Sequence, residues 1–290
     1  MTTMTTGPSQ ADWDRADLWG SPRQTRGIGP VDAVWALVWF IVVQVVVTAF
    51  ALAAITSDPL ADPTLVTDSS VVLIAGLVSL WAVFGGFPLF VSWRHGTHSL
   101  ARDFGLVPPW AARALRHLVI GFAAGLALRA MSIGASLLAG HLGLPAGENS
   151  SWLTSSRALG ATVFLMIGAA VIGPIFEEIF FRGFLMRTIT DWATPGWLAK
   201  IRRRPPASAL PSWWPRARGV IAIVTSSVLF GFMHITGADA AGAFVVTTTG
   251  TVGLVLAIMT ARSGTLSMAI GAHVAFNSSG IALMLLGVAG

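Results

Sequence analysis

Residues 173–183 read Gly-Pro-Ile-Phe-Glu-Glu-Ile-Phe-Phe-Arg-Gly. They continue an apolar run that begins near Ala158, so the charged side chains of Glu177, Glu178 and Arg182 fall inside a segment hydrophobic enough to enter a membrane. Charges are costly in a lipid bilayer and are usually kept there for function. The stretch therefore predicts a polar site inside a membrane protein.

The composition of the whole chain supports this interpretation. Of the 290 residues, 54% are hydrophobic and 11% are charged, and the mean hydropathy is +0.73. These values are typical of membrane proteins and unlike those of soluble domains. Cysteine is absent, which excludes thiolate catalysis and cysteine-ligated metals. The basic residues cluster in short loops between apolar runs, a pattern of membrane orientation, so we expect no nucleic-acid partner.

Apolar runs divide the chain into membrane spans. A bilayer-spanning helix needs about 20 apolar residues, so we predict an all-α polytopic bundle of about seven or eight membrane helices in contact with the lipid bilayer. A Gly- and Ala-rich third run favours close helix packing, and the polar residues 277–280 would break the last run into two helices. The runs cover roughly residues 33–55, 71–91, 118–138, 159–186, 220–235, 241–261 and 266–288.

The charge distribution predicts domain organisation and orientation. Residues 1–30 are polar and predict a disordered cytoplasmic tail, followed by a transmembrane domain over 31–290. Basic loops at 94–116 and 187–218 and around Arg262 alternate with acidic or nearly neutral loops, which places the N-terminus in the cytoplasm. The preference for arginine over lysine and the absence of cysteine suggest a GC-rich genome, and we expect the protein in a bacterial plasma membrane.

The helical period separates the two carboxylates of the opening stretch. Glu178 and Arg182 are four residues apart and can pair on one face of a helix. Glu177 lies about 100° further round and has no basic residue at i+4. A structural Glu–Arg pair explains Glu178 and Arg182 but not Glu177, which is left free to act as a general base. Pro174 should loosen the helix one turn earlier.

Two histidines in later spans could join Glu177. His234 has Phe230 one turn before it, and His273 has Asn277 one turn after it. Either histidine alone is more often a hydrogen-bonded polar residue at a helix interface than a catalyst. Together with Glu177, however, they supply a base, a second acid or base, and hydrogen-bond donors, which suits the attack of water on a carbonyl. Two histidines and a carboxylate could also hold zinc, although no His-Glu-x-x-His motif is present.

Three ordered motifs carry a family resemblance. Glu177-Glu178-x-x-x-Arg182, Phe230-x-x-x-His234 and His273-x-x-x-Asn277 resemble, without substitution, the motifs of the CAAX-protease and bacteriocin-processing (CPBP, or Abi) family of intramembrane proteases. The resemblance implies that Glu177 and His234 activate water and that His273 and Asn277 stabilise the oxyanion. It makes Glu178, Arg182 and Phe230 structural supports, and residues 158–290 the catalytic core. The family has also been described as metalloproteases, which leaves open a zinc ion on Glu177, His234 and His273.

These observations predict an intramembrane endopeptidase acting on a peptide or membrane-protein substrate, with a site open toward the cytoplasmic half of the membrane. The alternatives are a non-catalytic scaffold or immunity-type protein of the same fold and a small-solute transporter. Counted along their helices from the cytoplasmic side, the motif residues lie at different depths in the membrane. They can meet only if helices tilt, begin outside the membrane, or break, for example at Pro174. Arg129 in the third run has three open roles: pairing with a motif carboxylate, binding a substrate C-terminus, or packing.

Overall fold

The computed structural model describes residues 28–56, 69–108, 111–147, 153, 158–192 and 214–287. The regular secondary structure of these residues is helical throughout. The expected tail up to residue 27, the acidic loop at 57–68, Glu148, and the basic loop at 193–213 lie outside the described residues.

The elements form a bundle of long helices. They are α2 (Pro30–Ala53), α4 (Ser70–His95), α5 (Leu100–Phe104), α6 (Ala112–His141), α7 (Leu159–Ile167), η2 (Gly168–Ile172), α8 (Gly173–Glu178), η3 (Ile179–Leu185), α9 (Met186–Trp192), α11 (Trp214–Phe232), α12 (Ala240–Ser263) and α13 (Ser267–Leu285). The segments from α7 to α9 join end to end into one composite helix.

Within the described residues, six helices are long and apolar enough to cross a membrane: Pro30–Ala53, Ser70–His95, Ala112–His141, Leu159–Thr190, Ala240–Ser263 and Ser267–Leu285. A shorter apolar helix covers Ala217–Phe232. Large apolar side chains also face outward, among them Phe50 at 75% and Leu137 at 71% exposure. A soluble monomer rarely exposes so much apolar surface. The chain is therefore an all-α, polytopic integral membrane protein, as predicted.

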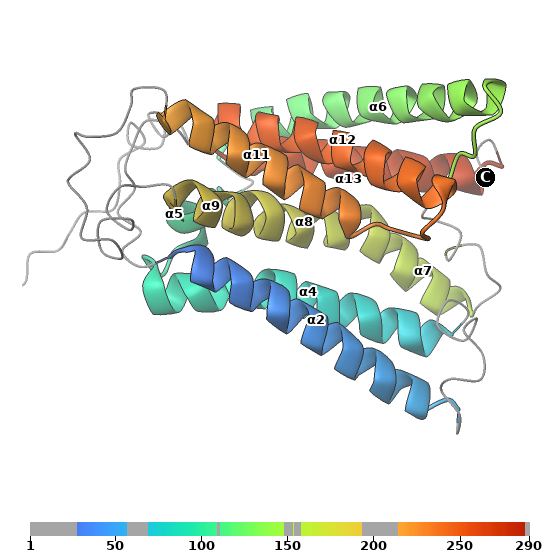
Figure 1. The fold of residues 1–290 in the computed structure, drawn as a ribbon, viewed down its shortest axis with the longest axis horizontal. Coiled ribbons are helices and arrows are strands. Elements are labelled where there is room, and N and C mark those ends of the chain that lie inside the picture. The colour runs from blue at the N-terminus through green and yellow to red at the C-terminus, as the bar shows by residue number, and fades with distance from the viewer. Residues whose placement is uncertain are drawn as a thin grey trace, which may run out of the picture.

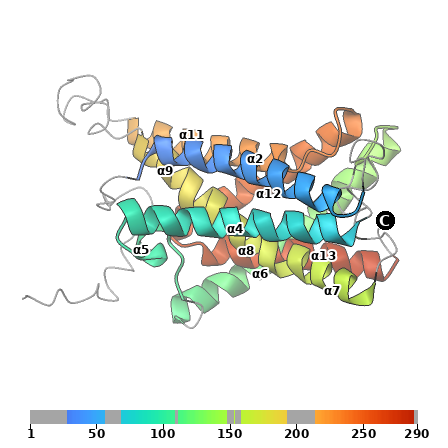
Figure 2. The same ribbon diagram turned by 90° about the horizontal axis from the view of Figure 1, so that it is seen from below.

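The composite helix lies between two groups of helices. Helices α2 and α4 form an antiparallel pair on one side, and α6, α11, α12 and α13 lie on the other (Figure 1). Aromatic rings join α4 to η3, with Phe84 stacked on Phe180 at 4.3 Å between centroids and edge-on to Phe181. Figure 2 shows α4 crossing in front of α8 when the molecule is viewed from below.

Small residues bring α6 and α13 into close contact. A Cβ added at Gly125 would clash with the carbonyl oxygen of Ala272, and one added at Gly271 would clash with that of Leu118. The missing side chains allow the two backbones to touch, as expected from the Gly- and Ala-rich third run. Helix α13 runs unbroken from Ser267 to Leu285, so the predicted break at 277–280 is wrong. Its polar side chains bond to nearby carbonyls, as Ser279 Oγ does to that of Ala275 at 2.7 Å.

Candidate active site

The composite helix is distorted on both sides of Pro174. Two π-helical segments, η2 and η3, flank the short α8 that carries the paired glutamates. Proline has no N–H to donate to the carbonyl four residues earlier, so Ala170 loses its usual helical partner. Side chains of α13 bond to the carbonyls left there: Asn277 Nδ2 donates to Ala169 at 2.9 Å and Ser278 Oγ to Ala170 at 3.5 Å. The expected loosening at Pro174 is therefore present. The carbonyls that it leaves free bind side chains of α13 and hold that helix in place.

Glu178 belongs to a buried ionic cluster. Its Oε1 accepts from Arg182 Nη1 at 2.9 Å and lies 2.9 Å from His273 Nδ1, and the Glu178 and Arg182 side chains have 0% exposure. Arg182 Nη2 donates to the carbonyl of Gly253 at 3.0 Å. The predicted i,i+4 pair is formed, and His273 extends it from another helix.

Glu177 points to a different environment. Its Oε2 lies 3.7 Å from His273 Nε2 and 4.0 Å from His234 Nε2. The same oxygen is buried and has no hydrogen-bond partner among the described residues. Both distances are too long for hydrogen bonds, but the 4.0 Å between Glu177 Oε2 and His234 Nε2 leaves room for one bridging water. The structure thus brings together Glu177, His234 and His273, and leaves Glu177 as the uncommitted carboxylate.

Phe230 packs at the centre of these groups. Its ring lies 4.2 Å from the Arg182 guanidinium carbon, and its centroid is 4.7 Å from that of His234 and 5.5 Å from that of His273. The Phe230 carbonyl lies 2.8 Å from His234 Nδ1. Because a carbonyl only accepts, this nitrogen carries a proton and the neutral ring presents Nε2 as an acceptor.

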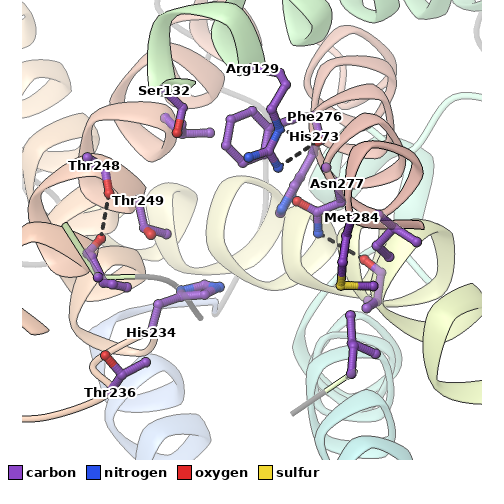
Figure 3. Close-up of a pocket in the computed structure, with 18 of the residues that line it drawn as sticks. Arg129, Ser132, His234, Thr236, Thr248, Thr249, His273, Phe276, Asn277 and Met284 are labelled. Atoms are coloured by element: carbon purple, nitrogen blue, oxygen red, sulfur yellow. Dashed lines mark hydrogen bonds between the residues drawn. The ribbon is translucent and has the colours of Figure 1, made fainter. Parts of the chain in front are cut away.

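A cavity of about 770 Å³ contains the site. Its lining includes Glu177 together with His234, His273 and Asn277, of which the last three are labelled in Figure 3, so the four predicted catalytic residues face one space. The lining also reaches Ala146, at the end of the bundle opposite the arginine-rich helix ends. The site was expected to open toward the arginine-rich end instead. The reason is that α11 stops at Phe232, so residues 233–236 line the space a longer helix would fill.

Arg129 lines the same cavity but does not pair with a motif carboxylate. Its Nε and Nη2 donate to the carbonyl of Phe276 at 3.1 and 2.9 Å. Other polar groups in the lining were missed from the sequence, namely Ser132, Ser136, Thr248 and Thr249. The spacing of Arg129, Ser132 and Ser136 places them on one face of a helix, a signal that the sequence did contain.

The donor set does not fit a zinc ion. Within the described residues, no group of three or more histidine, aspartate or glutamate side chains is arranged to hold a metal. We therefore derive no chemical step through a metal at Glu177, His234 and His273.

Comparison with known proteins supports the family resemblance. Residues 159–279 match the sequence profile of the Rce1-like family, described as type II CAAX prenyl endopeptidase Rce1-like. No curated protein and no solved structure matches the chain. The matched stretch contains all three motifs, from Glu177 to Asn277. The match over residues 159–279 is therefore consistent with the resemblance to CPBP intramembrane proteases.

Proposed function

We propose that the protein is an intramembrane endopeptidase that hydrolyses a peptide bond with a water activated by Glu177 and His234. The observation that carries the proposal is the position of Glu177 Oε2, buried, without a hydrogen bond, and facing two histidine Nε2 atoms at 3.7 and 4.0 Å. A free carboxylate in an enclosed cavity beside histidine suits general-base catalysis.

The two hydrogen-bond acceptors beside the water fix its orientation. Glu177 Oε2 and His234 Nε2 are both acceptors, and a water at about 2.8 Å from each would give one hydrogen to each. Its lone pair then points into the cavity, toward a bound carbonyl. Glu177 takes one proton as the oxygen attacks, and the proton passes to the leaving nitrogen. The water oxygen ends in the new carboxylate.

His273 and Asn277 are the proposed donors to the oxyanion. Because the Glu178 carboxylate only accepts, His273 donates through Nδ1. Its Nε2 can donate as well when the ring carries both protons. Asn277 uses one amide hydrogen on Ala169 and has a second for the oxyanion.

The direct test is cleavage of a peptide library by purified protein in lipid nanodiscs. Glu177→Gln should lower the rate by about 10²–10⁴-fold, the usual contribution of a general base. Asp32→Asn makes the same chemical change at the start of α2 and should retain activity. In ¹⁸O-labelled water, the new carboxylate should gain one labelled oxygen. Equal product from wild type and Glu177→Gln rules out this mechanism, whereas no product from wild type favours the scaffold alternative.

Treatment with a chelator tests whether cleavage requires a metal ion. Because the described side chains do not form a metal-binding group, we expect cleavage to persist after treatment with a strong chelator. Metal analysis of the same active sample should show far less than one ion per chain. Loss of activity that zinc restores would contradict this expectation and support zinc at Glu177, His234 and His273.

The remaining proposals concern the substrate, the membrane and the orientation of the protein in it. The substrate is a peptide or membrane-protein segment that reaches the cavity, and the membrane is a bacterial plasma membrane with the basic bundle end in the cytoplasm. Arginines at this end meet neighbouring elements, as Arg187 Nη1 does at the carbonyl of Asp103, 2.8 Å away. The positive-inside rule supports this orientation.

A further inference from the structure

Arg129 is a cation in the middle of a membrane helix that the proposed chemistry does not use. It lies twelve residues before the end of α6 at His141, or about 18 Å along the axis. It lines the same cavity as Glu177 and His273. None of the ion pairs among the described residues includes it. An unneutralised charge at this depth calls for an anionic partner.

The guanidinium is held in a fixed place. Its Nε and Nη2 donate to the Phe276 carbonyl, and its central carbon lies 3.9 Å from the centre of the Phe276 ring. A Cβ added at Gly280 would clash with Nη2, so the missing side chain makes room for the group. Nη1 makes no hydrogen bond to a described residue. Figure 3 shows Arg129 beside Phe276 at the same pocket as His273 and Asn277.

The contacts of Arg129 on α13 give the distance of its guanidinium from the proposed site of cleavage. Phe276 and Gly280 follow His273 by three and seven residues on α13, or about 4.5 and 10 Å along its axis. An extended peptide advances about 3.3–3.6 Å per residue. The guanidinium therefore lies about two or three substrate residues from His273. Ser132, one turn further along α6, adds a polar group to the same lining.

We infer that Arg129 binds a carboxylate of the peptide substrate, about two or three residues from the scissile bond on the Asn277 side. The inference rests on the proposed protease function and narrows its substrates to peptides with an anionic group at that place. The carboxylate is either the peptide's C-terminus or an acidic side chain. A planar guanidinium matches a carboxylate well. A lipid phosphate is the less suitable partner, because headgroups lie near the ends of the helices.

Binding can be tested without catalysis. The Glu177→Gln protein, in phosphatidylcholine nanodiscs, is titrated into a fluorescein-labelled apolar hexapeptide and followed by fluorescence anisotropy. The peptide is prepared with a C-terminal carboxylate, with a C-terminal amide, and as an amide carrying one internal Glu. At least one anionic form should bind about 10- to 100-fold more tightly than the neutral amide, as expected for a charge-assisted hydrogen bond. The preferred form identifies the carboxylate's source.

Variants assign the preference to Arg129. Adding Arg129→Gln should bring the ratio of affinities close to one while binding of the neutral amide persists. Arg116→Gln, an exposed arginine on the same helix, should leave the ratio unchanged. Gly280→Ala keeps the arginine but fills its slot, so it should reduce the ratio and serves as a second variant if Arg129→Gln does not fold.

Three results would overturn the inference. The first is equal binding of all three peptides, or a preference that survives both Arg129→Gln and Gly280→Ala. The second is loss of neutral-amide binding in a folded Arg129→Gln, which would indicate a structural role. The third is loss of the preference when phosphatidylglycerol is added to the nanodiscs, which would assign the site to a lipid phosphate. A protein that discriminates between the peptides but cleaves none would refute the protease function alone.

Discussion

Two neighbouring glutamates have different surroundings, which supports different proposed roles. The Glu178 side chain is fully buried and is held by Arg182 and His273, whereas Glu177 is 16% exposed and faces the cavity. A buried carboxylate with charged partners serves structure, since its desolvation is offset only while those partners remain. A carboxylate that faces a cavity beside histidines is available for proton transfer.

Glu178→Gln should therefore destabilise the protein more than Glu177→Gln. Removing one partner of a buried ion pair leaves an uncompensated charge on Arg182 and costs about 3–5 kcal/mol. Thermal unfolding in detergent should show a clear drop for Glu178→Gln and little change for Glu177→Gln. Matching unfolding curves for the two variants would contradict the division of roles.

The sequence predicted the local half of this arrangement. The i,i+4 spacing is sufficient to pair Glu178 with Arg182 and to leave Glu177 free. It could not predict the contact of His273 with Glu178, which joins residues 95 apart in the chain. Spacing within one helix does not identify which other helix lies against it, so that contact required the tertiary structure. The same limit applies to Arg129 and Phe276.

At the scale of elements, backbone contact between α6 and α13 fixes the second half of the site. These helices carry Arg129 on one side and His273 and Asn277 on the other. Their approach depends on glycines whose Cβ positions are occupied by the partner's carbonyls, among them Gly125. Close contact of this kind is a common source of affinity between membrane helices.

Gly125→Ala should separate the two helices and lower stability, because the new Cβ would overlap the Ala272 carbonyl. Gly134→Ala on the same helix is the matched control, since a Cβ there meets nothing within 4 Å. The control should be neutral or stabilising by about 0.5–1 kcal/mol. Unfolding temperatures of the two variants measure the difference, and equal effects would show that the contact is unimportant.

Element boundaries were predicted less well than element existence. The fifth apolar run was expected to continue to residue 235, whereas α11 ends at Phe232. Asp239 then accepts from the N–H of Gly242 at 2.8 Å and starts α12. Met233 and Ile235 on either side of His234 are apolar, so the apolar run hides the end of the helix.

At the scale of the whole molecule, arginines gather at one end of the bundle. They lie at the C-terminal ends of α4 and α12, on α5, and at the start of α6 and α11 (Figure 1). Composition and alternating loop charge were sufficient to predict this multispan helical class. They could not predict that the cavity reaches the other end, because that depends on where α11 stops.

The absence of native cysteine makes the orientation simple to measure. In intact bacterial cells, Arg94→Cys should be protected from a membrane-impermeant maleimide and Leu144→Cys should be labelled. Both positions are exposed and lie at opposite ends of the bundle. Labelling in opened cells confirms that each thiol can react. The reverse pattern would place the basic end outside the cytoplasm.

The π-helical turn in η2 also affects how the chain can change in length. A π turn closes its hydrogen bond over one more residue than an α turn, so η2 holds one residue in surplus. A homologous chain could lose that residue, form a regular helix, and still present Glu177 on the same face. It would lose the carbonyl that Asn277 bonds to at Ala169. Length variation at this point would therefore leave the proposed base, Glu177, in place while releasing the proposed oxyanion donor, Asn277.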